Sequence, residues 1–457
     1  PSMTSSLPAK EQTLTGWGCT DATTAEVVQP ERLDQISHLL QNAPPRSVIS
    51  RGLGRAYGNP AQCEAGTVID LAQFNHIQLD PESGTLLAGS GASLDSILQV
   101  IVPAGFFLPV TPGTRFVTVG GAIAADVHGK NHHREGSFAS HVLEVRLLDG
   151  EGHERLLRPN DPNSSAAFWA TCGGMGLTGV IVEARFELIP ITTSLISVDT
   201  QRYGDLESLM TAMVEGDDRY RYSVAWVDSL HGPGRGVLTR GDHANLDQWN
   251  DQKSTSENPL FYDPKALGTA PSLLPGGLLN NWTVRAFNEA WFRKAPRRRE
   301  GELQAITPFF HPLDGVNNWN RIYGPSGFLQ YQFVVPDSAG DLVGRCLAAL
   351  RKIGAPSFLT VLKRFGEGNQ GPLSFPMPGW TLAADVPAAV PGLMETLDEL
   401  DQLVADAGGR LYLAKDSRQS ATMFARSYPG LEAWRRERDQ LDPRHVFESD
   451  LSRRLAI

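Results

Sequence analysis

Residues 50–60 read Ser-Arg-Gly-Leu-Gly-Arg-Ala-Tyr-Gly-Asn-Pro and follow a short β-branched run that ends at Ile49. Glycines at 52, 54 and 58 remove Cβ atoms from one side of this turn, so backbone N–H groups can converge on an anion such as a phosphate. The G-x-G-x-x-x-G spacing is one residue longer than the dinucleotide-binding fingerprint, and no amphipathic helix follows it. The turn therefore indicates either a plain connection between strands or a diphosphate cradle that is not of the Rossmann type.

Two more loops of small residues strengthen the second interpretation. One spans 112–124 and contains Gly113 and Thr-Val-Gly-Gly-Ala-Ile-Ala at 118–124; the other reads Cys-Gly-Gly-Met-Gly-Leu-Thr-Gly at 172–179 and enters a strand at Val180. Small residues are needed where backbone packs flat against a bulky planar ligand or its phosphates. Three such loops beside strands predict a large diphosphate-linked cofactor lying across the domain.

Length and composition set the broad class of the protein. The 457 residues suggest two or three domains, and the net charge of -10 lacks the basic surface of a nucleic-acid binder. No apolar run approaches the roughly 20 residues of a membrane span, and the first residues show no secretory signal. The scattered cysteines predict neither a disulfide framework nor a zinc site: Cys19, Cys63, Cys172 and Cys346.

The first 190 residues predict an α+β unit. Strands are expected at 67–71, 84–88, 143–147 and 180–188, and Ser93 is expected to cap a helix over 94–101. From 193 to 409 the segments become longer, and 254–300 shows little periodicity, which predicts a mobile loop region. That region places Trp282, Trp291 and Phe292 beside Lys294 and the arginines at 297–299. Such a mixture suits an anionic lipid surface or a solvated charge run.

The run His128-Gly-Lys-Asn-His-His133 suggests a metal site, because His128 and His132 are four residues apart. Gly129 and Asn131 disfavour a helix there, and no carboxylate or thiolate stands at ligand spacing. A polar loop lining a ligand pocket is the better interpretation.

Two lysines lie in apolar surroundings. In the predicted strand 359–365, the period of two places Lys363 on the face of Leu359 and Val361, which is costly for an amine unless it works in a pocket. Gln330 and Gln332 share one face of the strand 328–333, which suits either solvent or a pocket. Lys415 follows the apolar run 411–414 and could take up a proton if burial lowers its pKa; a structural pairing with Asp416 is the alternative.

Together these motifs resemble a known family. The stretches at 51–58, 111–115, 119–124, 128–133, 328–333 and 414–418 resemble the flavin subunits of decaprenylphosphoryl-β-D-ribose 2′-epimerase, which have the vanillyl-alcohol-oxidase type of FAD fold. The resemblance spans nearly the whole chain. It implies an α+β fold in two domains: an FAD-binding domain from 1–192 and a C-terminal return at 410–457, and a substrate-binding domain with an antiparallel sheet at 193–409.

The resemblance also implies roles for individual positions. Lys415 matches the catalytic lysine of the family. The implied FAD contacts are Ser50, Arg51, Gly52, Leu53, Gly54, Arg55, Ala56, Tyr57, Gly58, Asn59, Pro60, Gly113, Thr118, Val119, Gly120, Gly121, His128, Gly129, Lys130, Asn131, Val180 and Tyr412. The implied substrate contacts are Lys130, Trp226, Arg321, Gln330, Gln332, Lys363, Thr381 and Ala383.

Two positions depart from what relatives carry. Some relatives of the fold have a histidine bonded covalently to the flavin where this chain has Arg55, so non-covalent FAD is expected. Mycobacterial members have a cysteine where this chain has Ala383 after Pro-Gly-Trp-Thr-Leu at 378–382. That cysteine is the target of covalent nitroaromatic inhibitors and is not needed for hydride transfer.

The function implied by the resemblance is FAD-dependent oxidation of the 2′-hydroxyl of decaprenylphosphoryl-β-D-ribose, the first half of epimerisation to the arabinose donor of cell-wall arabinan. It implies a polyprenyl-phosphoryl ribose substrate, an NADH-dependent short-chain reductase as partner, peripheral membrane contact and no nucleic acid. The implied location is the cell envelope, although no export signal is visible and a cytoplasmic location stays open. The alternatives are a sugar or alditol oxidase of this fold that uses O₂, and a flavin- or lipid-binding module in which Lys415 is structural.

Overall fold

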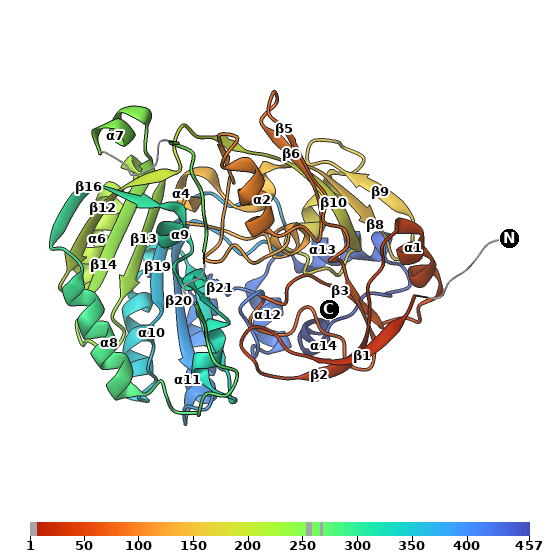
Figure 1. The fold of residues 1–457 in the computed structure, drawn as a ribbon. Helices are drawn as coiled ribbons and strands as arrows, with labels where there is room; N and C mark the ends of the chain where they lie inside the picture. The colour runs from red at the N-terminus through yellow and green to blue at the C-terminus, as the bar shows by residue number, and fades with distance from the viewer. Residues whose placement is uncertain (1–6, 253–257, 266–267) are drawn as a thin grey trace.

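Two β-sheets organise the N-terminal part of the chain (Figure 1). The computed structural model describes residues 7–252, 258–265 and 268–457. The first sheet has the order β1-β2-β4-β3, with β1 (Ala9–Leu14), β2 (Thr23–Val28), β4 (Thr67–Asp70) and β3 (Val48–Arg51). The second has the order β5-β6-β10-β8-β9, with β5 (Ile77–Asp80), β6 (Thr85–Gly89), β10 (Val180–Glu187), β8 (Val142–Leu148) and β9 (Glu154–Leu157).

The predicted helix at 94–101 is confirmed as α2 (Leu94–Ile101). Ser93 caps it, because its side chain accepts a hydrogen bond from the Ser96 N–H at 3.0 Å. Its apolar stripe is fully buried against the second sheet. The other helices and the short strands of this part are α1 (Leu33–Asn42), α3 (Val119–Ala124), α4 (His132–Glu135), α5 (Ser165–Thr171), β7 (Phe106–Phe107) and β11 (Ile189–Pro190).

A large antiparallel sheet forms the other side of the molecule, with the order β16-β12-β14-β13-β19-β20-β18-β21. Helices α6 (Leu206–Gly216), α10 (Asp341–Lys352) and α11 (Leu393–Asp406) cover one face and bury its apolar side chains, such as Tyr331 and Phe333. The strands are β12 (Leu195–Tyr203), β13 (Tyr222–Val227), β14 (Gly236–His243), β16 (Arg298–Ala305), β18 (Phe328–Val335), β19 (Thr360–Phe365), β20 (Gly379–Pro387) and β21 (Arg410–Leu411).

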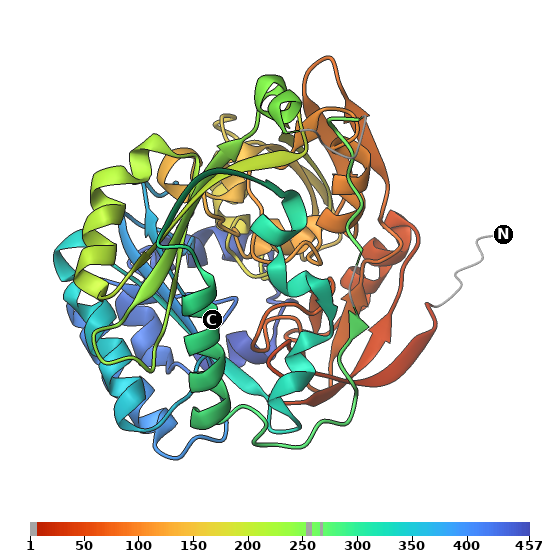
Figure 2. The ribbon, with the colours of Figure 1, turned by 60° about the vertical axis from the view of Figure 1, so that its left-hand side comes forward.

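The end of the chain returns to the N-terminal sheets, as Figures 1 and 2 show for its blue segments. After β21, the helices α12 (Ala421–Ser427), α13 (Leu431–Leu441) and α14 (Asp450–Leu455) pack into the core that contains Val48 and Ile49 of β3. The Trp434 indole N–H donates to the Ala170 carbonyl at 3.0 Å. We propose the domain boundaries 1–192, 193–409 and 410–457 for this arrangement.

The prediction of an aperiodic loop over 254–300 is wrong for residues 281–294 and 298–300. The segment contains helix α8 (Asn281–Lys294) and the start of β16. Helix α8 buries only Val284 and Asn288, one turn apart, and leaves its tryptophans exposed, so no apolar stripe is visible in the sequence. Residues 253–257 and 266–267 of the predicted loop lie outside the described residues. The remaining elements are α7 (Leu246–Asp251), β15 (Gly268–Thr269), α9 (Ile306–Phe310) and β17 (Val316–Asn317).

Candidate active site

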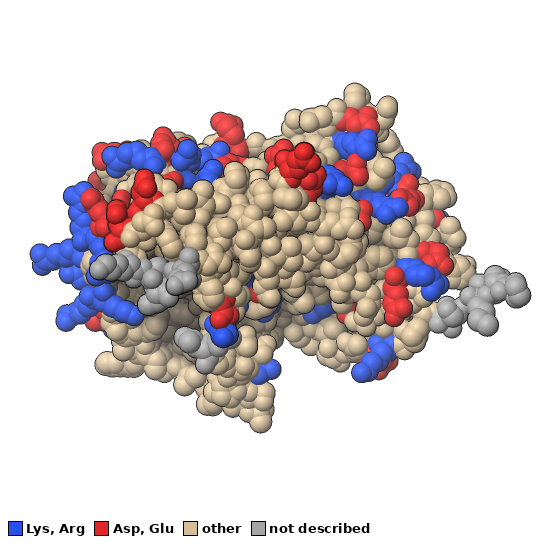
Figure 3. Space-filling model, turned by 45° about the horizontal axis from the view of Figure 1, so that its top comes forward, with Lys and Arg blue, Asp and Glu red and all other residues tan. Residues whose placement is uncertain are grey.

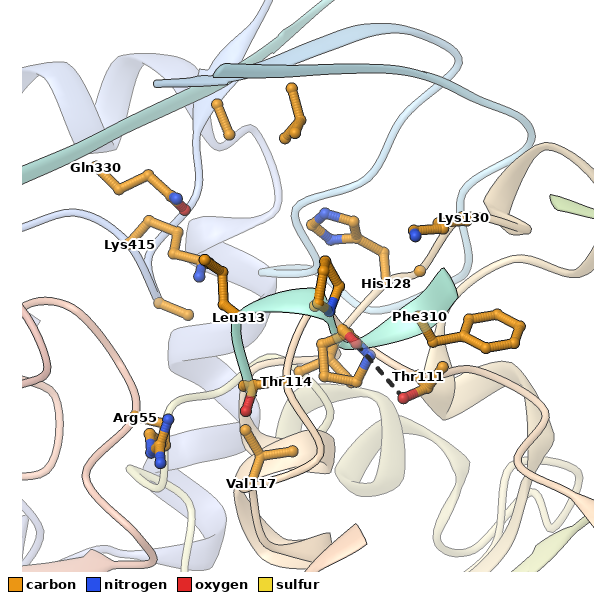
Figure 4. A pocket seen from close by; sticks show the side chains of 18 of the residues that line it. Arg55, Thr111, Thr114, Val117, His128, Lys130, Phe310, Leu313, Gln330 and Lys415 are labelled. Carbon is orange, nitrogen blue, oxygen red and sulfur yellow. Dashed lines mark hydrogen bonds between the residues drawn. The ribbon is translucent and has the colours of Figure 1, made fainter. Parts of the chain in front are cut away.

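A cavity of about 1150 Å³ lies where the N-terminal sheets, the large sheet and the returning C-terminal segment meet. Its walls come from the turn after β3, the loops at 111–130, the uncovered face of the large sheet, the segment 302–313 and the residues after β21. Figure 4 shows side chains that reach it from these elements, among them Arg55, Thr111, His128, Lys130 and Lys415. Segments far apart in the sequence therefore build one site.

The cavity brings together most of the residues predicted to contact the cofactor. Those that line it are Ser50, Arg51, Gly52, Leu53, Gly54, Arg55, Ala56, Tyr57, Pro60, Gly113, Thr118, Gly120, Gly121, His128, Gly129, Lys130 and Tyr412. The others are buried and do not line the cavity: Gly58, Asn59, Val119, Asn131 and Val180. Val119 and Val180 belong to the apolar cores, and the Asn131 amide donates to the Pro109 carbonyl at 2.8 Å.

The glycines of the turn at 50–60 permit close backbone packing. A Cβ on Gly52 would lie 2.4 Å from Oγ1 of Thr118, and one on Gly58 would lie 2.2 Å from the Asp416 carbonyl oxygen. Gly54 has φ of +66°, a left-handed conformation that disfavours other residues. Gly113 is different, because no atom lies within 4 Å of its added Cβ and the space beside it is cavity. Thr118 caps α3 by accepting from the Gly121 N–H at 3.1 Å.

Three buried polar atoms on the cavity wall have no hydrogen-bond partner: Ser50 Oγ, Ser90 Oγ and His128 Nδ1. Buried polar groups are rarely left unpaired in native proteins, since each costs about 1–3 kcal/mol. The Gln332 amide donates to His128 Nε2 at 3.2 Å, which assigns the ring proton to Nδ1. The wall thus offers unused donors and acceptors to a polar ligand.

Three of the lysines that line the cavity have lowered pKa values. Burial lowers the pKa of Lys130 to about 7 and that of Lys363 to about 8, and the Lys363 charge adds to the effect at Lys130. The Lys130 ammonium donates to the Phe309 carbonyl. Burial and the charge of Lys363 also hold the pKa of His128 well below its ordinary value, so this ring is neutral.

Lys415 extends into the cavity with its Nζ 3.9 Å from the centroid of the Tyr57 ring. Burial lowers its pKa to about 7; the Asp385 carboxylate opposes this shift and the Lys363 ammonium adds to it. Asp416 is not its partner, because that carboxylate accepts from Arg454 at 2.8 Å and from the backbone N–H groups of 418 and 419. Lys415 therefore has the charge state of an amine that can take up a proton near neutral pH.

The residues predicted to contact the substrate divide into two groups. Those on the cavity wall are Lys130, Trp226, Gln330, Gln332, Lys363 and Ala383. Thr381 lies behind it, where its hydroxyl accepts from Gln332 at 3.1 Å. Arg321 also lies away from the cavity wall and donates to the Ala270 carbonyl at 2.9 Å. The period-two argument that placed Lys363 beside Leu359 and Val361 is confirmed, since all three line the cavity.

Sequence reasoning missed Asp385. It lies opposite Gln330 in the pairing of β20 with β18, on the cavity side of the sheet, and is fully buried. The signal was available: a carboxylate alternates with Ala383 in the apolar strand 379–387, as Lys363 does in β19. Burial raises the pKa of Asp385 to about 7, against the hydrogen bond from Gln330 and the charge of Lys415.

Comparison with known proteins agrees with this geometry. A model of the FAD binding domain matches residues 24–157. A decaprenylphosphoryl-β-D-ribose oxidase from Mycolicibacterium smegmatis is 43% identical over 463 aligned positions, which cover 99% of each chain. The chain belongs to the decaprenylphosphoryl-β-D-ribose oxidase family.

Other relatives cover less of the chain. An uncharacterized protein in the mprA 5′ region of Streptomyces coelicolor is 38% identical over 80% of this chain and 100% of its own length. A D-lactate dehydrogenase from Archaeoglobus fulgidus is 24% identical over 41% of this chain and 44% of its own. The predicted α+β fold of the vanillyl-alcohol-oxidase type, with an antiparallel substrate sheet, is confirmed.

The cavity fits the FAD that this oxidase family and the matched domain require. Three features suit a polar, planar dinucleotide. The turn at 50–57 is tightly packed, and the open space beside Gly113 is one that an added Cβ would enter. Buried polar atoms of Ser50, Ser90 and His128 also have no hydrogen-bond partner. Within the described ranges no cluster of His, Cys, Asp or Glu could hold a metal ion. No helix of the described chain is both long and apolar enough to cross a membrane.

Proposed function

We propose that this chain oxidises the 2′-hydroxyl of a polyprenyl-phosphoryl β-D-ribose to the 2′-ketone. The observation that carries the proposal is the position of Lys415, an amine with a pKa of about 7 on the wall of a cavity shared by the FAD-binding turn and the large sheet. The 43% identical relative is named for oxidation of such a substrate.

Each group has a separate task in this reaction. When bound, FAD supplies the two-electron acceptor for the hydride that leaves C2′. The turn at 50–57, Gly113, the residues 118–121 and His128 hold the cofactor. Neutral Lys415 takes the hydroxyl proton: the O–H bond breaks, an N–H bond forms on Nζ, and loss of the hydride turns the carbinol carbon into a ketone.

The remaining walls suit the two ends of the substrate. Lys130 and Lys363 provide positive charge for a phosphodiester, which is a single negative charge, while Gln330 and Gln332 offer hydrogen bonds to the ribose. Apolar side chains continue from this polar part toward α8 and suit a prenyl chain; they include Trp226, Phe287, Trp291, Leu303, Phe309 and Phe310.

The test is anaerobic mixing of the FAD-loaded protein with a prenyl-phosphoryl β-D-ribose while the flavin absorbance is followed. We expect bleaching by the ribose compound and none by the matching 2-deoxyribose compound. Lys415→Ala should keep its flavin and lose bleaching by at least about a hundredfold, as expected for removal of a general base. Retained bleaching in this variant would refute the role of Lys415. Hydrogen peroxide formed in proportion to substrate would instead identify an O₂-using sugar oxidase.

We propose that FAD is held without a covalent bond. Arg55 stands in the turn, with its guanidinium 3.7 Å from the centroid of the Trp17 ring, and a guanidinium is not a nucleophile toward the flavin. Acid precipitation should therefore release all of the flavin into the supernatant. Yellow colour that stays with the pellet would contradict this.

We propose that a separate NADH-dependent reductase consumes the ketone. The glycine spacing at 52–58 is not that of a nicotinamide dinucleotide site, so this turn does not have the pattern that binds NADH. Arabinose product should appear only when a short-chain reductase and NADH are added to the oxidised mixture.

We also propose contact with a membrane surface of the cell envelope through the α8 patch, defined as Trp282, Phe287, Trp291, Arg285, Lys294 and Arg297. Trp282 is 85% exposed, and Phe287 and Trp291 stack at 5.9 Å and also line the cavity. The three cations are exposed and make no ion pair with any described carboxylate. Exposed aromatic residues mixed with unpaired cations suit an anionic bilayer.

A further inference from the structure

Asp385 is a buried carboxylate on the cavity side of the large sheet, and the reaction proposed above assigns it no role. Its backbone N–H donates to the Leu359 carbonyl at 3.1 Å, and its Oδ1 accepts from the Gln330 amide at 2.5 Å. The residue is 0% exposed, and β18 and β19 pair with its strand on both sides. Its carboxylate is therefore fixed in position.

The second carboxylate oxygen, Oδ2, has no hydrogen-bond partner. Burying a carboxylate without satisfying both oxygens costs several kcal/mol, by order of magnitude, unless an opposite charge compensates it. The titratable groups that interact with it are Lys415, Tyr57 and Tyr323, and the Tyr323 hydroxyl is also buried and unpartnered. Lys415 is the cation among them.

The environment of Lys415 shows why such a charge matters. Lys363 and His128 lie on the same cavity wall. The positive charge of Lys363 and the low dielectric of the buried site both disfavour the ammonium form of Lys415. The π-face of Tyr57 at 3.9 Å and the Asp385 carboxylate favour the ammonium. No ion pair of 4.0 Å or less joins these two described residues, Asp385 and Lys415, so their interaction is electrostatic without direct contact.

We propose that Asp385 is a positioning residue whose ionised carboxylate, fixed in position, stabilises the ammonium that forms on Lys415 when it takes the 2′-hydroxyl proton. This inference rests on the proposed function. The proton moves from O2′ to Nζ of Lys415, and no bond forms at Asp385. The hydrogen bond from Gln330 holds the Asp385 carboxylate in place. Gln330 itself lines the cavity, and Figure 4 shows that its side chain and that of Lys415 reach the same cavity.

The first experiment measures the ionisation of Lys415 directly. Acetic anhydride acylates neutral amines, so the pH dependence of Lys415 labelling in the FAD-loaded protein, followed by peptide mass spectrometry, gives its midpoint. Asp385→Asn should lower that midpoint by about one pH unit or more, because a stabilising opposite charge is lost. Asp385→Glu keeps the negative charge. Its midpoint should therefore differ from that of the wild type by no more than about half of the shift seen in Asp385→Asn. If Asp385→Asn does not fold, Asp385→Ser removes the same charge with a smaller side chain.

The second experiment uses flavin bleaching by the prenyl-phosphoryl ribose. In Asp385→Asn the acidic limb of the pH profile should move to lower pH, and the limiting rate should fall about tenfold, because the weaker base takes the proton less readily. Lys363→Met removes the repelling charge and should move the labelling midpoint the opposite way. The inference would be overturned if Asp385→Asn shifted neither the midpoint of Lys415 labelling nor the acidic limb of the pH profile of flavin bleaching. Wild-type protein that is not bleached at any pH would refute the proposed function instead, while the labelling experiment would still test Asp385.

Discussion

At the scale of single residues, the proposed chemistry of this site depends on amines that are held partly neutral. Lys130, Lys363 and Lys415 share one cavity, and burial lowers the pKa of each. An ordinary lysine is almost fully protonated at neutral pH and cannot accept a proton, whereas an amine with a pKa near the working pH can do so.

The first prediction concerns the pH dependence of substrate oxidation. The pKa of Lys415 is lowered to about 7, so below this pH the residue is an ammonium and cannot accept the hydroxyl proton. The rate of anaerobic flavin bleaching should therefore rise about tenfold per pH unit below the midpoint and level off above it. Stopped-flow measurements across the range test this. A rate that is independent of pH, or one that falls as pH rises through neutrality, would contradict it.

The second prediction concerns Ala383, which lies on the cavity wall opposite Gln332 in the strand pairing. A methyl group has no nucleophile, so wild-type protein turning over with a nitroaromatic inhibitor should gain no mass. Ala383→Cys adds a thiol at a position that is 5% exposed and faces the cavity. This variant should gain about one adduct per chain in intact-mass spectra. Ser374→Cys, buried outside the cavity, is the matched control and should stay unmodified.

At the scale of secondary-structure elements, the turn at 50–60 and the start of α3 depend on each other. An added Cβ at Gly52 would meet Thr118 Oγ1 at 2.4 Å, and that oxygen caps α3. Overpacking of this kind costs about 1–3 kcal/mol. Gly113 lines the same cavity but has no neighbour within 4 Å of its added Cβ.

These two glycines give the third prediction. Gly52→Ala should lower the melting temperature of the FAD-free protein by several degrees, because it displaces the cap of α3. Gly113→Ala should leave that melting temperature unchanged and weaken FAD binding about tenfold or more, because its methyl group occupies space meant for the cofactor. Thermal unfolding and flavin titration of both variants measure this. Equal FAD affinity in Gly113→Ala and wild type would contradict the cradle.

The strands show how far sequence reasoning could reach. Period-two alternation was sufficient to place Lys363 on the cavity side of β19, because the costly amine stood out among apolar neighbours. The pairing of Gln330 with Asp385 across 55 positions of sequence depends on strand register, which alternation within one strand does not determine. Helix α8 was missed for another reason: exposed tryptophans replace the polar face that an amphipathic pattern requires. These exposed aromatic residues are part of the α8 patch for which we propose membrane contact.

At the scale of the whole molecule, the site exists only because distant parts of the chain meet. The turn at 50–57 comes from the first sheet, Lys363 from the large sheet and Lys415 from the segment that returns to the N-terminal sheets. The cavity extends from these groups to Phe287 and Trp291, which also belong to the α8 patch. A lipid-linked substrate could thus enter from a bilayer without exposing its prenyl chain to water. In Figure 3, Lys and Arg side chains gather at the left-hand end of the molecule, where Figure 1 places β16 and α8.

The last prediction tests this orientation with vesicles. The protein should co-sediment with vesicles that contain phosphatidylglycerol and bind less to pure phosphatidylcholine vesicles, because about 1 kcal/mol is gained per cation near an anionic surface. A triple variant should bind anionic vesicles at least about tenfold more weakly; it combines Arg285→Glu, Lys294→Glu and Arg297→Glu. Trp282→Ser should weaken binding to both types of vesicle. Arg436→Glu, at an exposed position of α13 on the side of the N-terminal sheets, is a charge-reversal control away from the patch and should bind like wild type. In the triple variant and in the Arg436→Glu control, a short-chain, water-soluble substrate should bleach the flavin as in wild type, since none of the changed charges is assigned to the reaction. Equal vesicle binding by the triple variant and the Arg436 control would show that the α8 patch does not face a membrane.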